Sequence, residues 1–263
     1  MDTDGVEAFD RVRLDGTGID RITEGEVVAV VREALATGRG GRIITPNVDI
    51  LRRARVNRRV RTYLDDADLV VADGMPLVWA SRLSGTPLPG RVAGSSLIWS
   101  LSEGLGRDGR CVYVVGGMPA AGGVPDGASR AADRLAAECP GLRIAGALCP
   151  AWGFEKDRRA YAEICAEVAA AQPDLVFVGL GFPKQEKVIT RLRERLPHAW
   201  FIGCGAAVNF VAGDIDRAPR WMQRSGLEWA HRLGTEPHRL AARYLKHDAP
   251  YAMKLLAGAA TRR

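Results

Sequence analysis

The sequence predicts an α/β protein with a mainly parallel sheet of about six strands flanked by helices. Short apolar runs recur along the chain, and each is followed by a turn and a helical stretch, which favours parallel strands joined by crossovers. The runs lack clean apolar–polar alternation, as expected of strands covered on both faces. In chain order they are RIIT (42–45), DLVVA (68–72), CVYVV (111–115), LRIAGAL (142–148), DLVFVGL (174–180) and AWFIG (199–203).

The segments between these runs have helical patterns. After the first run, Ile50, Leu51 and Ala54 lie at helical spacing. Residues 156–171 predict a longer helix that ends before the Gln172-Pro173 pair. We find no internal repeat and no low-complexity linker, so the strands and helices up to residue 216 are assigned to one α/β core.

From Arg217 onward the strands stop and a basic, helical segment begins. Residues 217–263 contain ten Lys/Arg and three Asp/Glu, a balance of +7, whereas the whole chain carries +6, so residues 1–216 carry −1. The predicted domains are therefore a core (1–216) and a basic helical appendage (217–263). Such charge asymmetry indicates a surface that faces phosphates of a nucleic acid, a nucleotide-linked substrate or an anionic membrane.

Composition narrows the class of protein. With 263 residues, 47% hydrophobic and 26% charged, the chain has the make-up of a soluble globular protein. The acidic start MDTDGVEAFD predicts no signal peptide, and no apolar run approaches the roughly 20 residues of a membrane span. Five scattered cysteines without a C-x-x-C pair predict reduced, mostly packed thiols in a cytosolic protein.

Ligands of such sheets bind beyond the carboxyl ends of the strands. Gly or polar residues follow five of the predicted strands, which predicts a cleft there. These residues are Thr45 and Asn47, Asp73, Gly116 and Gly117, Gly181 with Lys184 and Gln185, and Gly203 with Gly205.

Asp73 directly follows the apolar run 69–72 and precedes Gly74 and a helical pattern. It can cap that helix, or it can face the cleft as a base toward a hydroxyl group. The two roles are compatible. Thr45 and Asn47 likewise fit either an Asx-type turn that starts a helix or a pair of polar groups aimed at a sugar or phosphate.

The glycine-containing turns fit tight strand-to-helix connections or phosphate cradles. They are not dinucleotide fingerprints, because Lys184 and Val208 stand where G-x-G-x-x-G/A needs its last small residue. A P-loop is also lacking, so NAD and ATP chemistry lose support. Two Asp-x-Asp pairs, at 66/68 and 214/216, could hold a metal-bound nucleotide sugar, but the first lies at the wrong end of the sheet and the second lacks further ligands. Zinc spacing of His and Cys is also lacking, so we predict no catalytic metal and no cofactor.

The basic segment predicts two short helices with a break at Gly234-Thr235. Arg239 and Arg243 are four residues apart, so they share a face of the second helix. A solvated basic face is one interpretation. The aromatic residues among the arginines favour a lipid interface instead; they are Trp221, Trp229 and Tyr244.

Several motifs together resemble the WecG/TagA/CpsF family of glycosyltransferases, from about Val12 to Tyr244. They are TPNVDILRRAR, ADGMPLVWASRLSG with RVAGSSLI, PDLVFVGLGFPKQE, and GCGAAVNFVAGDIDRAPRWMQRSGLEWAHRLGTEPHRLAARYL. The resemblance implies a Rossmann-like, inverting, metal-independent enzyme. Members move N-acetylmannosamine or its uronic acid from UDP to polyprenyl-diphosphate-linked N-acetylglucosamine, for teichoic acid linkage units or surface polysaccharides.

The resemblance also implies roles for single residues. Asp73 matches the proposed general base, and Thr45 and Asn47 match a polar pair beside it. Arg91 and Gln185 match residues that bind the sugar nucleotide. Members of the family have a C-terminal element that closes over the site at the membrane. The arginines that match it are Arg232, Arg239 and Arg243.

We count Thr45 with Asp73 as a catalytic residue. The substrate-binding residues also include Gly116, Gly117, Gly181 and Lys184. Asn209 stands where many members carry Asp and is given no catalytic role. The expected partners are a UDP-sugar, a lipid-diphosphate-linked sugar and an anionic membrane surface, at the inner face of the cell membrane and without nucleic acid. The oligomeric state is left open, a homo-oligomer included.

Two other functions remain open. One is a soluble glycosyltransferase with a small-molecule acceptor, over which the basic segment closes. The other is a non-enzymatic binder of a nucleotide sugar or nucleic acid, although the segment lacks a recognisable nucleic-acid module. An NAD oxidoreductase is disfavoured because the fingerprint fails.

Overall fold

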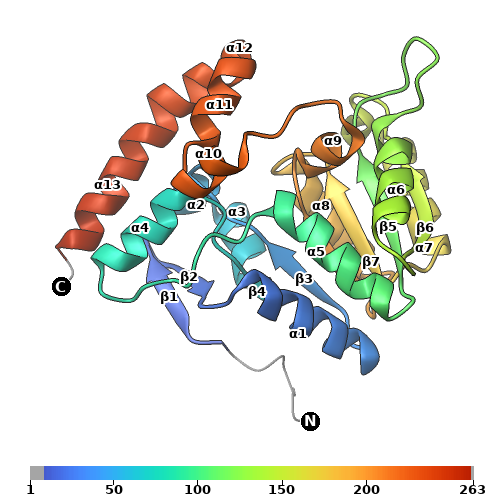
Figure 1. Cartoon of the computed structure of the whole chain (residues 1–263), viewed down its shortest axis with the longest axis horizontal. Helices are drawn as coiled ribbons and strands as arrows, with labels where there is room; N and C mark the ends of the chain where they lie inside the picture. Colours follow the sequence, from blue (N-terminus) through green and yellow to red (C-terminus); the bar gives the residue numbers. More distant parts are fainter. Residues whose placement is uncertain (1–8, 262–263) are drawn as a thin grey trace.

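The computed structural model describes residues 9–261, except for the side chains at positions 220, 224, 225 and 239. It confirms the Rossmann-like α/β class: six strands form one sheet in the order β4-β3-β8-β7-β5-β6, with parallel pairing throughout (Figure 1). All six predicted strands are present, the second shorter than predicted. They are β3 (Gly41–Ile44), β4 (Leu69–Val70), β5 (Cys111–Gly116), β6 (Arg143–Leu148), β7 (Leu175–Gly179) and β8 (Trp200–Gly203).

Helices cover both faces of the sheet, and alternate strand residues point to opposite faces. Ile43 packs with one set of helices and its neighbour Ile44 with the other. The first set is α1 (Glu24–Ala36), α5 (Gly94–Arg107), α6 (Gly127–Glu138) and α9 (Ala207–Ala212). The second is α2 (Val48–Val56), α3 (Arg58–Asp65), α7 (Arg158–Ala170) and α8 (Lys184–Arg193). Burial on both faces explains why the strand sequences are continuously apolar.

An N-terminal hairpin, which the sequence analysis did not predict, lies beside the sheet. Strands β1 (Arg11–Leu14) and β2 (Thr17–Asp20) pair antiparallel around Asp15 and Gly16, whose φ angles are 46° and 81°. Asp-Gly suits such a turn because both residues tolerate positive φ. The Asp20 carboxylate accepts a hydrogen bond of 2.6 Å from the Val70 amide, so the hairpin covers part of the edge strand β4.

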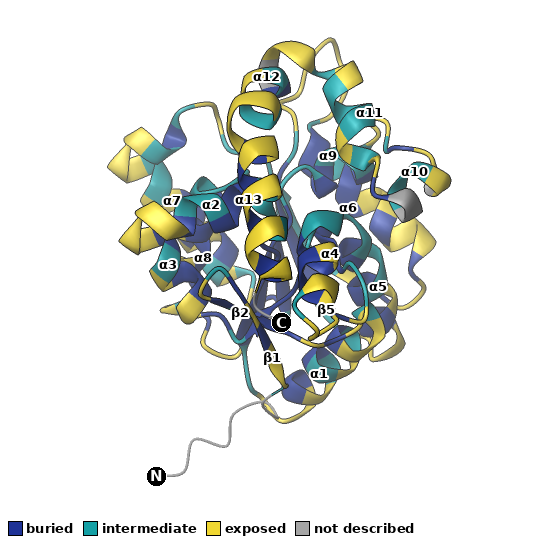
Figure 2. Cartoon of the chain, turned by 90° about the vertical axis from the view of Figure 1, so that its left-hand side faces the viewer, coloured by how far each residue is buried: buried dark blue, intermediate teal, exposed yellow. Residues whose placement is uncertain are grey.

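The C-terminal segment folds back over the core. It comprises α10 (Arg220–Ser225), α11 (Glu228–Thr235), α12 (Pro237–Ala241), a π-helical stretch (Ala242–Asp248) and α13 (Ala249–Ala260). Helix α13 packs along α4 (Met75–Leu83), with its outer face exposed (Figures 1 and 2). Tyr251 and Leu255 are buried in the same cluster as the hairpin. The predicted boundary at residue 217 stays a prediction.

The predicted helix break at Gly234-Thr235 lies slightly too early. Helix α11 continues through Thr235, whose hydroxyl donates to the carbonyls of His231 and Arg232 at 3.2 Å and completes the last turn. The break falls at Glu236, with φ −129° and ψ 55°. Pro237 explains this position, because a proline disfavours helical geometry at the residue before it.

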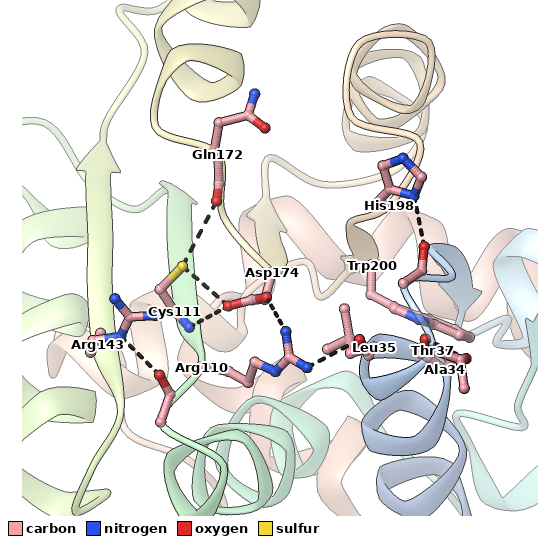
Figure 3. A network of polar contacts seen from close by, with 12 residues as sticks. Ala34, Leu35, Thr37, Arg110, Cys111, Arg143, Gln172, Asp174, His198 and Trp200 are labelled. Atoms are coloured by element: carbon pink, nitrogen blue, oxygen red, sulfur yellow. Dashed lines mark hydrogen bonds and ion pairs between the residues drawn. The ribbon is translucent and has the colours of Figure 1, made fainter.

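A polar network ties the strands together at the end of the sheet opposite the predicted cleft (Figure 3). The Asp174 carboxylate accepts from the Cys111 amide at 2.7 Å and from Arg110 at 3.0 Å, and Arg110 also donates to the Leu35 carbonyl at 3.1 Å. The amino ends of β5 and β7 are thereby joined to α1. All five cysteines are free thiols, as predicted.

None of the helices within residues 9–261 combines the length and the apolar character that a bilayer crossing requires.

A buried ion pair stabilises the centre of the sheet. Arg42 on β3 pairs with Glu186 on α8; these side chains are 1% and 0% exposed, and the guanidinium lies 5.2 Å from the Tyr63 ring. Removing one partner leaves an uncompensated buried charge. We therefore expect Glu186→Gln to lower the free energy of unfolding by about 3–5 kcal/mol in urea titrations.

Glu163→Gln serves as the control for this prediction. Its partner Arg159 is 89% exposed, so we expect a loss below about 1 kcal/mol. Equal losses for the two variants would contradict the proposed importance of the buried pair.

Candidate active site

The candidate cleft lies where β3 and β8 end side by side. Helix α2, which follows β3, covers one face of the sheet, whereas α9, which follows β8, covers the opposite face. Between such strands the connections diverge and leave a crevice at the carboxyl ends. Thr45 Oγ1 lies 3.5 Å from the Gly203 carbonyl oxygen across this junction, and Thr45 is buried. The topology therefore places Thr45 at the floor of the predicted crevice.

Asn47 and Gln185 flank this floor and make structural hydrogen bonds. Asn47 Oδ1 accepts from the Ile50 amide at 3.2 Å and caps α2, which confirms the turn interpretation. Gln185 is buried, and its Oε1 accepts from the Gly205 amide at 3.1 Å. The Asn47 Nδ2 group makes no hydrogen bond to the described part of the chain. Asn47 can therefore donate to a ligand while it caps its helix.

Asp73 enters the same region from the end of β4. Its amide donates to the Pro46 carbonyl at 2.9 Å, which fastens the loop after β4 to the loop after β3. The N-cap position of α4 is Gly74, with φ 137°, and no side chain caps this helix. The capping interpretation of Asp73 is therefore wrong, and its carboxylate is not engaged by the α4 terminus.

Burial and the surrounding charged side chains set the pKa of the Asp73 carboxyl group. Burial is the largest influence and raises the pKa of Asp73 from its ordinary 3.8 to about 6. Arg91, Arg232 and Arg217 act in the opposite direction, whereas Glu228 raises the pKa further. A carboxyl group with a pKa near neutrality, surrounded by cations, is typical of a catalytic site.

This pKa makes stability depend on pH in a defined direction. Between pH 4 and 6 the folded protein holds the Asp73 proton more firmly than the unfolded chain does, so the contribution of Asp73 to stability falls as pH rises through that range. We expect Asp73→Asn to be more stable than the parent by up to about 3 kcal/mol at pH 7.5 and nearly equal to it at pH 4 in urea titrations.

Asp108→Asn is the matched control, because the Arg32 side chain lowers the pKa of Asp108 instead. It should not stabilise the protein at pH 7.5. A stability difference for Asp73→Asn that is the same at both pH values would contradict the raised pKa.

Residues of the C-terminal segment reach this cleft. Arg91 Nη1 lies 2.8 Å from Glu228 Oε2 on α11, and the two side chains are only 15% and 12% exposed. Arg217 donates to the Ser95 carbonyl at 3.1 Å and to Ser96 Oγ at 3.0 Å, at the start of α5. The segment between α9 and α12 therefore lies over the crevice.

Two further contacts hold the C-terminal segment against the core. The Arg232 guanidinium lies 5.6 Å from the centre of the Phe210 ring on α9. Gly226 ends α10 with φ 79°, and a Cβ added there would lie 2.5 Å from Met75 Cγ. Glycine is thus required where the segment crosses α4. Sequence reasoning missed Arg217 and Glu228; the only local signal was two acids, at 228 and 236, among five arginines between 217 and 239.

Some buried polar atoms of α9 and the C-terminal segment make no hydrogen bond within the described residues. They include Asn209 Oδ1, Arg217 Nε, His231 Nδ1 and Arg232 Nε. Buried polar groups are usually paired, so these atoms are exceptions to that rule.

Other predicted site residues lie elsewhere. Arg243 contacts Asp248 at 3.4 Å and its own neighbour Tyr244, away from the charges that act on Asp73. Arg239 is on α12, but its side chain lies outside the described residues. Lys184 pairs with Glu155 at 2.5 Å, and Gly181, with φ 74°, has open space around it. The structure therefore brings Arg232, but not Arg243 or Lys184, to Asp73.

Gly116 and Gly117 are required by packing. Their φ angles are 129° and 86°; a Cβ on Gly116 would lie 2.6 Å from the Gly179 carbonyl oxygen, and one on Gly117 would lie 2.6 Å from the Ala128 amide. The interpretation of these glycines as a tight strand-to-helix turn is wrong, because β5 ends at Gly116 and α6 begins only at Gly127; close backbone packing requires them instead. Ligand binding by them stays a prediction.

We expect Gly117→Ala to lower the free energy of unfolding by more than about 2 kcal/mol, because positive φ and a backbone clash add. Gly109→Ala is the control, since Gly109 also has positive φ (62°) but nothing within 4 Å of an added Cβ. Its loss should stay near 1 kcal/mol, or about the cost of the left-handed conformation alone. Equal thermal shifts for the two variants would contradict the packing argument.

One aspartate of each Asp-x-Asp pair forms an ion pair. Asp214 pairs with Arg130, and Asp68 lies 3.2 Å from Arg193. Among the described residues, no group of three or more His, Cys, Asp or Glu side chains could hold a metal ion. Independence from a metal stays a prediction.

The parallel sheet with helices on both faces defines the class as a Rossmann-like α/β protein, and comparison with known proteins specifies its family. Residues 12–263 match the model of the glycosyl transferase WecG/TagA/CpsF family. The chain therefore belongs to this family of glycosyltransferases, as its motifs predicted.

Two relatives are named N-acetylglucosaminyldiphosphoundecaprenol N-acetyl-beta-D-mannosaminyltransferase. The one from Bacillus spizizenii (strain ATCC 23059 / NRRL B-14472 / W23) is 36% identical over 205 residues, which cover 78% of this chain and 75% of the relative. The one from Bacillus subtilis (strain 168) is 32% identical over 200 residues, with 76% and 73% covered.

Proposed function

We propose that this glycosyltransferase moves N-acetylmannosamine, or its uronic acid, from a UDP-sugar to N-acetylglucosamine on a polyprenyl diphosphate. The observation that carries this proposal is Asp73, a partly buried carboxyl group with a pKa of about 6 beside Arg91, Arg217 and Arg232. The names of the two Bacillus relatives support both the sugar and the acceptor.

In the proposed reaction Asp73 takes the proton of the acceptor hydroxyl as that oxygen attacks the anomeric carbon. The bond from the anomeric carbon to the UDP oxygen breaks on the opposite side, so the configuration inverts. Arginine side chains preorganised around the leaving diphosphate stabilise its charge, as a metal ion does in other transferases. Thr45 and Asn47 lie beside Asp73 in the loops that its amide joins, and they are suited to orient the sugar.

The C-terminal segment is proposed to meet the membrane that carries the acceptor. It exposes large apolar side chains next to basic ones, which is a pattern of interfacial helices. These side chains are Trp221, Trp229, Leu245 and Met253. The protein would then act at the inner face of the cell membrane as a peripheral enzyme.

The test is UDP release by the purified protein across a panel of UDP-sugars. Each donor is offered with a short-chain lipid-diphosphate N-acetylglucosamine or with a water-soluble N-acetylglucosamine glycoside, with and without EDTA. Lipid-dependent release that is unaffected by EDTA is expected. Efficient transfer to the soluble acceptor would favour the small-molecule alternative, and loss of activity in EDTA would contradict the metal-free mechanism.

A further inference from the structure

Glu228 is the acidic residue of α11 that turns toward the cleft. Residues three and four apart share a face of a helix, so Glu228, His231 and Arg232 lie together. Glu228 and Arg232 both act on the charge of Asp73, whereas Trp229 between them is exposed. Helix α11 therefore presents a polar face to the site.

Polar contacts, not apolar burial, hold α11 in place. None of the described α11 side chains is fully buried. The 2.8 Å ion pair from Glu228 to Arg91 joins the C-terminal segment to the loop between α4 and α5. An ion pair that is largely shielded from water is strengthened by its surroundings, and loss of one partner leaves the other charge uncompensated.

We propose that Glu228 is a positioning residue of the transfer reaction, which fixes the Arg91 guanidinium at the rim of the cleft and seats α11 over Asp73. This inference rests on the proposed function. Glu228 bonds to Nη1 of Arg91 alone. The remaining N–H groups of Arg91 have no other hydrogen-bond partner within the described residues, so they are available to the diphosphate of the donor.

Glu228 also balances the charges around Asp73. The groups that act on this carboxyl come from three segments: Arg91 before α5, Arg217 after α9, and Glu228 with Arg232 on α11. Glu228 is the one acid among them. Without its charge the three cations would favour the ionised form of Asp73, which would then be a weaker base.

The first experiment compares Glu228→Gln with Glu228→Asp. For Glu228→Gln we expect weaker UDP binding and a loss of up to about 10²-fold in kcat/KM, because Arg91 is no longer held. The acid limb of its pH profile should also move to lower pH. Glu228→Asp keeps the charge and should keep the limb near pH 6. An unmoved limb in Glu228→Gln, or tighter UDP binding, would overturn the proposal, the latter by showing that Glu228 competes with the donor.

A second experiment tests the same contact without the reaction. Limited proteolysis of the ligand-free protein between residues 217 and 248 should be at least about tenfold faster in Glu228→Gln and in Arg91→Gln, because each variant breaks the pair. The double variant should be no faster than the single ones. Glu194→Gln, in an exposed pair on the far end of α8, is the control without effect.

Additive effects of the two substitutions on proteolysis would overturn the contact between Glu228 and Arg91. A parent protein that transfers no sugar to any acceptor would instead overturn the proposed function, and the proteolysis result would still stand by itself.

Discussion

Asp73→Asn is expected to lower the turnover of sugar transfer by a factor of about 10²–10⁴, with little change in UDP binding. The amide has nearly the same shape and keeps its place between the loops after β3 and β4, but it cannot accept the proton of the acceptor hydroxyl. The measurement is the initial rate of UDP release at saturating donor and lipid acceptor. Because the variant should be more stable than the parent at pH 7.5, unfolding cannot account for the loss.

The pH profile of the parent enzyme should show the titration of the Asp73 carboxyl group. Since only the ionised carboxyl can take a proton, kcat/KM should rise with pH through about 6 and then level off. This rising limb should be missing from the residual activity of Asp73→Asn. A near-normal rate in the variant would exclude Asp73 as the base.

Arg91→Lys is expected to lower kcat/KM by a factor of about 10²–10³. Lysine keeps the positive charge but lacks the planar fork that binds a carboxylate and a phosphate together. Two contacts should weaken at once: the electrostatic stabilisation of the leaving UDP, and the pair with Glu228 that seats α11. Donor titrations by calorimetry and rates with both substrates would separate binding from catalysis.

Arg159→Lys is the matched control for Arg91→Lys. Arg159 forms an exposed i,i+4 pair with Glu163 on α7, remote from the strand ends, so its replacement should leave kcat/KM unchanged. If Arg91→Lys matched the parent in both affinity and rate, neither the diphosphate nor Glu228 would depend on the fork of Arg91.

The sequence by itself predicted the sheet and the edge of the sheet at which the candidate site lies. A strand covered on both faces must be apolar throughout, so β5 and β7 stand out as continuous runs without any knowledge of their neighbours. All parallel strands end at one edge, so Thr45 and Asp73 could be assigned to a common cleft from their positions alone. The motifs of the WecG/TagA/CpsF family also imply a Rossmann-like sheet and a site that includes Thr45 and Asp73.

Only the tertiary structure revealed the shortest strands and the contacts between residues far apart in the sequence. The β1–β2 hairpin has four residues in each strand, too few to produce a clear pattern, and it is stable because it packs against β4 and α13. Glu228 and Arg91 are 137 residues apart, and nothing in either local sequence indicates that they meet.

The pKa of Asp73 is set in the same way. Its main cause is burial, and burial depends on how the loops after β3 and β4 join and on where α11 lies. Local sequence fixes which residues a strand end carries, because backbone and packing preferences act over a few residues. The charge state of a carboxyl depends on every group within several ångströms, and only the folded chain brings those groups together.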